Sequence, residues 1–106
     1  MAVIQIREED FDRFVLKNKK TVLVEFYDHE NMMCRALNPI LAELAEDLAG
    51  LLVIAKLTSD NLEDFGRQYG LESIPTMMVF CDGEKIDSMM GLRNKQQIFE
   101  MIKKHL

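Results

Sequence analysis

A nearly unbroken run of apolar residues, Thr21–Tyr27, most constrains how this chain can fold. Such runs are typical of strands buried on both faces, because successive side chains point to opposite sides of a sheet. A helix follows, since apolar residues recur at the i, i+3, i+4, i+7 spacing of one helical face. This strand and helix predict an α/β protein. The helical residues are Leu37, Ile40, Leu41, Leu44, Ala45 and Leu48, with Gly50 placed as a C-terminal cap.

The remaining segments alternate between strand and helix patterns. Asp82-Gly83 marks a tight hairpin turn, and Asn94 with Gln97 three residues later forms a capping box. The order β-α-β-α-β-α-β-β-α predicts one domain over residues 1–106, with a mixed sheet of about five strands flanked by four helices. The other predicted strands are Val3–Ile6, Leu51–Leu57, Thr76–Cys81 and Glu84–Met90, and the other helices are Glu8–Asn18, a short one capped by Asp60 and ended by Gly70, and one opened by Asn94.

Composition excludes several classes of protein. The net charge of −5 argues against a nucleic-acid partner, which needs a basic face. No apolar stretch approaches the roughly 20 residues that cross a bilayer, and the acidic N-terminal segment is unlike a signal peptide. Cys34 and Cys81 without an export signal suggest a reducing compartment. We therefore expect a cytoplasmic monomer with no membrane contact, no cofactor and no metal.

Several short segments, in the same order and spacing, resemble the thioredoxin family across roughly residues 3 to 106. The resemblance implies the thioredoxin fold, in which the proline matching Pro75 is cis and borders the redox site. The matching pieces are Val22-Leu23-Val24-Glu25-Phe26-Tyr27, Asn38-Pro39-Ile40-Leu41, Ala55-Lys56-Leu57, Tyr69-Gly70-Leu71, Ile74-Pro75-Thr76, Phe80-Cys81-Asp82-Gly83-Glu84 and Met90-Gly91.

The family's Cys-x-x-Cys motif reads Asn31-Met32-Met33-Cys34 in this chain. In that family a thiolate at a helix N-terminus attacks a disulfide, and a second thiol releases the mixed disulfide. Asn31 stands in the place of the attacking cysteine, and Cys34 matches the resolving one. Cys81 lies six residues beyond Pro75, about 20 Å along a strand, which is too far for a bridge. The resemblance therefore predicts a degenerate active site.

Each residue of this motif has two interpretations. Asn31 is either a helix N-cap that accepts the N–H groups of the first turn or an amide that binds substrate. Cys34 is either a small buried hydrophobic residue or a single reactive thiol, since its helical position favours the thiolate and burial opposes it. Glu25 matches the family's buried acid, and Lys56 in the neighbouring strand is its expected partner. Such a buried pair is also compatible with a purely structural role.

In the thioredoxin family, the loop that matches Met32-Met33 and the turn that matches Met90-Gly91 border one groove with the cis proline, so the resemblance implies a methionine-lined groove there. Soft, flexible thioethers suit binding to varied apolar segments. The competing interpretation is that one methionine of each adjacent pair packs in the core. We expect this for Met77 or Met78, and for Met89. The predicted binding residues are Asn31, Met32, Met33, Ile74, Pro75, Thr76, Met90 and Gly91.

Three functions follow from these features. The first is a thioredoxin-like protein of the cellular thiol system that binds extended peptide segments or protein partners without efficient dithiol reductase activity. The second is a monothiol enzyme in which Cys34 exchanges with glutathione-capped or protein disulfides, with Glu25 as its buried acid. The third is a subunit that docks into a larger assembly through the same groove.

Overall fold

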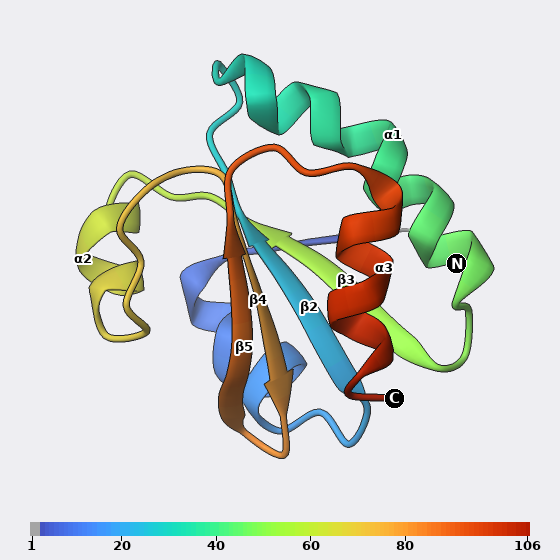
Figure 1. The fold of residues 1–106 in the computed structure, drawn as a ribbon. Coiled ribbons are helices and arrows are strands. Elements are labelled where there is room, and N and C mark those ends of the chain that lie inside the picture. The colour runs from blue at the N-terminus through green and yellow to red at the C-terminus, as the bar shows by residue number, and fades with distance from the viewer. Residues whose placement is uncertain (1–2) are drawn as a thin grey trace.

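The computed structural model describes residues 3–106 and has a central sheet with helices on both faces (Figure 1). The predicted single domain also included residues 1 and 2, which lie outside this range. The strands are β1 (Ile4–Ile6), β2 (Thr21–Phe26), β3 (Leu52–Leu57), β4 (Thr76–Cys81) and β5 (Glu84–Met90). The helices are η1 (Glu8–Asp10), η2 (Asp12–Leu16), α1 (Met32–Asp47), α2 (Leu62–Arg67) and α3 (Lys95–Lys103).

The sheet has the order β1-β3-β2-β4-β5. β1, β3 and β2 run parallel, whereas β4 is antiparallel to both β2 and β5. This arrangement confirms the predicted mixed sheet of five strands. The β4–β5 hairpin turns at Asp82 and Gly83, whose φ angles are 51° and 82°. Positive φ at both central residues is what a two-residue hairpin turn requires, and Asp and Gly supply it.

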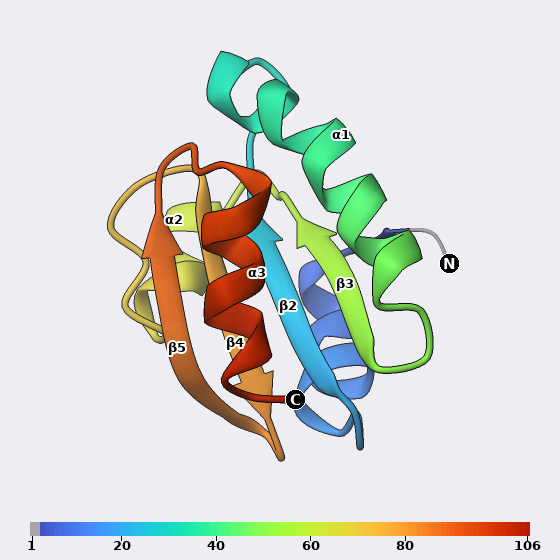
Figure 2. The ribbon, with the colours of Figure 1, turned by 45° about the vertical axis from the view of Figure 1, so that its right-hand side comes forward.

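Two hydrophobic cores lie on the two faces of the sheet. α1 and α3 cover one face, and η1, η2 and α2 cover the other (Figure 2). All six residues of β2 are buried, as its apolar run predicts. Leu23 belongs to the core under α1 and α3, whereas Val22 and Val24 belong to the core under η2 and α2. β2 is therefore the central strand between two layers of helices.

The N-terminal helix differs from the prediction of a regular helix over Glu8–Asn18. The segment forms a 3₁₀ turn and then a π-helical turn, in which the Lys17 N–H donates to the Asp12 carbonyl. The Phe11 and Val15 side chains are almost fully buried, and the Phe11 ring contacts four other aromatic rings. Tertiary packing anchors this segment, and the apolar spacing alone does not reveal the local geometry.

Two predicted helix ends are also wrong by one or two residues. α2 begins at Leu62 with Asn61 as its N-cap, rather than with Asp60. The Ser59 hydroxyl accepts the Asn61 N–H, so the turn that precedes the helix extends one residue further. α1 continues through Pro39 to Asp47, and Gly50 follows two residues after the Leu48 C-cap, with φ of +86°.

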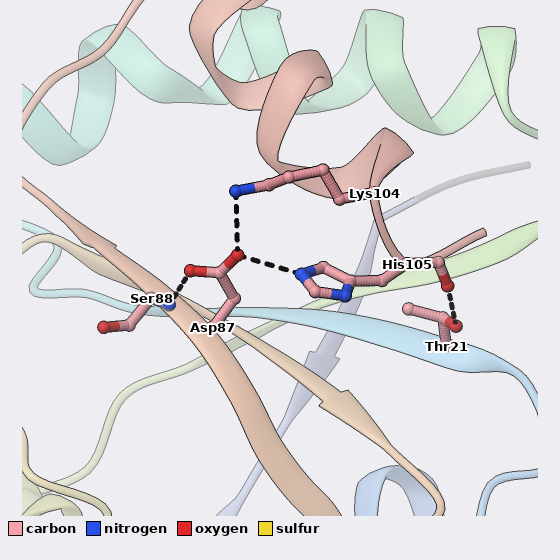
Figure 3. A network of polar contacts seen from close by, with 5 residues as sticks. All are labelled: Thr21, Asp87, Ser88, Lys104 and His105. Atoms are coloured by element: carbon pink, nitrogen blue, oxygen red, sulfur yellow. Dashed lines mark hydrogen bonds and ion pairs between the residues drawn. The ribbon is translucent and has the colours of Figure 1, made fainter.

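A polar network holds the C-terminal end of α3 against the sheet (Figure 3). The Asp87 carboxylate lies 2.8 Å from His105 Nε2, 3.4 Å from Lys104 Nζ and 2.9 Å from the Ser88 N–H. Thr21 on β2 donates to the His105 carbonyl at 3.0 Å. The hydrogen bond with His105 is the main reason that the pKa of Asp87 is lowered.

Among residues 3–106, no helix is long and apolar enough to cross a membrane.

Candidate functional site

The candidate site lies where β2 ends, β4 begins and α1 starts. Phe26 at the end of β2 pairs with Thr76 at the start of β4, and Asn31 is the N-cap of α1. Thr76 pairs in turn with Met90 at the end of β5. The sheet therefore brings the predicted site residues from three distant segments of the chain to one end of the molecule (Figure 1).

Asn31 caps α1 through its side chain, which confirms the N-cap interpretation. Its Oδ1 accepts the Met33 N–H at 2.8 Å and the Cys34 N–H at 3.1 Å. An asparagine cap of this kind stabilises a helix by about 1 kcal/mol relative to alanine. The Asn31 Nδ2 donates to the Ile74 carbonyl at 3.5 Å, a long contact that joins α1 to the proline loop. Both polar atoms of this side chain thus have partners within the protein.

The proline loop is held by hydrogen bonds to its own backbone. The Ile74–Pro75 peptide bond is cis, as the resemblance implies. The Thr76 hydroxyl donates to the Ser73 carbonyl at 2.6 Å, and the Gly91 N–H donates to the Pro75 carbonyl at 2.8 Å. Thr76 is only 3% exposed and Pro75 is buried, so contact of these two residues with a partner would use their backbone groups, and their part in binding stays a prediction. The hydrogen bonds to Ser73 and Gly91 hold the shape of the loop.

Three of the predicted methionines form an exposed apolar surface around this loop. The exposed fractions are 81% for Met32, 44% for Met33 and 48% for Met90. The Ser73 hydroxyl lies 3.5 Å from Met90 Sδ, which places this thioether beside the loop. Ile74, in the same loop, is half-buried and packs against the core under η2 and α2. We call these four residues (Met32, Met33, Ile74 and Met90) the methionine surface.

The Met77–Met78 pair is more buried than the sequence predicts. We expected one of Met77 and Met78 to pack in the core, but both are fully buried because β4 is covered on its two faces. Met89 packs against the core under α3, as expected. Met90, its neighbour on β5, points to the opposite side and stays exposed.

Cys34 is buried in the first turn of α1. Its side chain is 2% exposed and borders a cavity of about 270 Å³. Burial raises the pKa of the Cys34 thiol, and the nearby Glu25 carboxylate raises it further, whereas a backbone hydrogen bond with Asp28 lowers it. Burial therefore outweighs the stabilisation that a helix N-terminus offers to a thiolate. The remaining residues around the cavity are Tyr27, Asp28, His29, Arg35, Asn38 and Lys56.

Glu25 is fully buried next to the C-terminal end of β2. Among residues 3–106, neither of its carboxylate oxygens has a hydrogen-bond partner. Loss of solvation raises the pKa of Glu25 from 4.5 to about 7, although the positive charge of Lys56 opposes this rise. Burial therefore favours the protonated, neutral form of this carboxyl group.

Lys56 does not form the ion pair that we predicted with Glu25. The two residues are neighbours in the β2–β3 register, but no salt bridge within 4.0 Å joins them. The Lys56 ammonium donates to Asn38 Oδ1 at 2.6 Å and lies 4.2 Å from the centre of the Tyr27 ring. The sequence analysis missed this contact, although Asn38 is four residues after Cys34 and so shares its helical face.

Carboxylates line two cavities that Ile74 also borders. The sequence did not predict this acidic region. Two cavities of about 450 and 370 Å³ both include Glu63 and Ile74 in their walls. Their other acidic residues are Asp28, Asp60, Asp64 and Glu72. Arg67 is the one cation in these walls, and its guanidinium pairs with Asp64 at 2.9 Å.

Cys81 lies at the opposite end of the sheet, as predicted. It is the last residue of β4, directly after Phe80, which pairs with Val22 on β2. Its Sγ lies 3.9 Å from the Thr21 hydroxyl at the start of β2. Cys34 and Cys81 are both free thiols. Within residues 3–106, no group of three or more His, Cys, Asp or Glu side chains is placed to hold a metal ion.

We predict that replacing Glu25 with glutamine removes a pH-dependent loss of stability. The raised pKa keeps Glu25 protonated in the folded protein at pH values where the unfolded chain ionises. The free energy of unfolding therefore falls as pH rises from about 4.5 to about 7. Glu25→Gln should remove this fall, which amounts to about 3 kcal/mol for a shift of this size. Urea unfolding of the unmodified protein and of Glu25→Gln at pH 4.5 and pH 8 measures this change. The same loss of stability between the two pH values in both proteins would contradict the assignment.

We predict that Cys34 reacts slowly with a thiol reagent in the folded protein. A Cys81→Ser variant leaves Cys34 as the only thiol, and iodoacetamide labelling is then followed against pH by mass spectrometry. Burial and a raised pKa should keep labelling at pH 7 at least about tenfold slower than in urea. Rapid labelling of the folded variant at pH 7 would instead favour the monothiol enzyme.

Comparison with known proteins places the whole fold in one family. The thioredoxin family model matches residues 2–104. A thioredoxin of Staphylococcus epidermidis is 36% identical over 106 residues, covering all of both chains. A thioredoxin of Rickettsia bellii is 34% identical over 95% of this chain and 96% of its own length. Thioredoxin 1 of a Nostoc species is 32% identical over 99% of this chain and 98% of its own length. The chain belongs to the thioredoxin family.

Proposed function

We propose that this protein is a thioredoxin-family member of the cellular thiol system that binds extended peptide segments at the methionine surface. On this proposal its active site is degenerate, and it does not reduce disulfides efficiently. The observation that carries the proposal is the position of Asn31 at the helix N-terminus beside the cis proline. Its amide accepts the first-turn N–H groups that a thiolate would need.

The exposed thioethers support a binding role. Met32, Met33 and Met90 expose large flexible apolar side chains on both sides of the proline loop. Among residues 3–106, no hydrogen bond from the Ile74 N–H is found, so this donor is free to bind the backbone of an extended segment. The neighbouring carboxylates favour a partner that carries basic side chains, since complementary charges accelerate association.

The geometry gives less support to monothiol chemistry with glutathione or protein disulfides. The Cys34 thiol is almost fully buried, and its raised pKa leaves little thiolate at neutral pH. Docking into a larger assembly would use the same methionine surface, so it differs from peptide binding only in the partner. Two free thiols are typical of a reducing compartment, and we propose a cytoplasmic location on that basis.

We predict that an extended polypeptide binds at the methionine surface. The probe is fluorescein-labelled insulin B chain with its cysteines carbamidomethylated, so that it cannot form disulfides, and binding is measured by fluorescence anisotropy. A Met32→Glu/Met90→Glu variant should bind about tenfold more weakly, because charges replace apolar contact area. Leu51→Glu is the matched control, since Leu51 is 62% exposed in the turn between α1 and β3. Equal weakening in both variants would argue against this binding surface.

We predict that the protein fails to reduce insulin with a thioredoxin reductase and NADPH, and that Asn31→Cys confers activity. The introduced thiol would stand at the N-terminus of α1, where backbone N–H groups stabilise a thiolate, and Cys34 would resolve the mixed disulfide. The Asn31→Cys/Cys34→Ser variant is the control and should not turn over. Robust insulin reduction by the unmodified protein would refute the proposed loss of reductase activity.

A further inference from the structure

Six of the seven methionines in residues 3–106 fall into two classes of exposure, and Met89 is intermediate. Met32, Met33 and Met90 are 81%, 44% and 48% exposed. In contrast, the side chains of Met77 and Met78 are fully buried. Met101 is 4% exposed and packs in the core under α3. The three most exposed methionines among residues 3–106 all belong to the methionine surface.

These three sulfur atoms belong to one continuous part of the molecule. Met32 and Met33 open α1, directly after Asn31, whose Nδ2 contacts the Ile74 carbonyl. On the other side of the loop, the Ser73 hydroxyl lies 3.5 Å from Met90 Sδ. A chemical change at these atoms would therefore alter the polarity of the surface on both sides of the proline loop.

The thiols are less available to an oxidant than these thioethers. Thiol oxidation by a peroxide requires the thiolate, and burial keeps Cys34 protonated and out of solvent. Cys81 is partly exposed but lies at the opposite end of the sheet. A thioether has no proton to lose, so its reaction depends on contact with the oxidant. At this end of the molecule, the accessible sulfur belongs to methionine.

We propose that Met32, Met33 and Met90 form an oxidation site, at which a hydroperoxide converts the thioethers to sulfoxides and thereby releases a bound segment. The thioether sulfur attacks one peroxide oxygen, the O–O bond breaks, and an S=O bond forms. The sulfur loses two electrons, the hydroperoxide gains them, and the other oxygen leaves as water or an alcohol with the proton. The release of a peptide rests on the proposed function, whereas the oxidation itself does not.

Oxidation weakens binding because it changes the chemistry of the contact. A sulfoxide is polar and accepts hydrogen bonds, so burying it against an apolar segment costs solvation that a thioether does not lose. Methionine sulfoxide reductases reverse the change. The site would thus respond reversibly to an oxidant without the attacking cysteine that the family normally uses.

Peptide mapping tests the site independently of any partner. A Cys81→Ser variant is treated with hydrogen peroxide, and oxygen addition is followed by mass spectrometry after tryptic digestion. The cleavage sites separate the two classes of methionine, since residues 21–35 carry Met32 and Met33, residues 86–93 carry Met89 and Met90, and residues 68–85 carry Met77 and Met78. Fragment ions separate Met89 from Met90. We expect Met32, Met33 and Met90 to oxidise first. Equal rates at Met77 and Met78 in the folded protein would overturn the proposal.

Binding then tests the consequence. Peroxide treatment should weaken binding of the carbamidomethylated B chain by about tenfold. The matched variant Met32→Leu/Met33→Leu/Met90→Leu has no sulfur on this surface, so its own binding, measured before and after treatment, should not respond to peroxide. An equal loss of binding in this variant would overturn the proposed switch. If no probe binds before treatment, the proposed function fails. Peptide mapping then decides on the oxidation site by itself.

Discussion

The burial of β2 on both faces is the constraint on which the candidate site depends. Its side chains alternate between the two cores, so a shift of one residue would turn Glu25 into the opposite core. Pairing on both sides, with Lys56 on β3 and Met77 on β4, fixes that register. The same register sets where β2 ends, and therefore where Asn31 can begin α1 beside the proline loop.

The sequence predicts those elements whose signals are local. The Asn94–Gln97 capping box, the Asp82-Gly83 turn and the Asn31 cap each depend on residues at most three positions apart, and all three are present. The contacts that sequence analysis misses join residues that are distant in the chain. Lys56, for example, reaches Asn38 eighteen residues away.

Glu25 and Cys34 illustrate how one buried site can favour neutral groups. Burial raises the pKa of both, and the charge of Glu25 raises the pKa of Cys34 further. The positive charge of Lys56 opposes these shifts, but its ammonium is turned towards Asn38 and the Tyr27 ring. A catalyst that must deprotonate Cys34 would have to overcome this bias. A binding protein does not need to move a proton there, so the neutral state carries no disadvantage for the proposed function.

The residue at position 31 can either cap α1 with a neutral side chain or supply a nucleophile at the same place. The first-turn N–H groups of α1 can stabilise either a thiolate or a neutral cap, because both would use the same donors. Asn31 satisfies two of these donors and also contacts the Ile74 carbonyl, so it ties the helix to the proline loop. A cysteine would lose that contact and part of the capping energy in exchange for a nucleophile. On the proposed function, this position stabilises a surface that holds a partner and lacks the atom that would react with it.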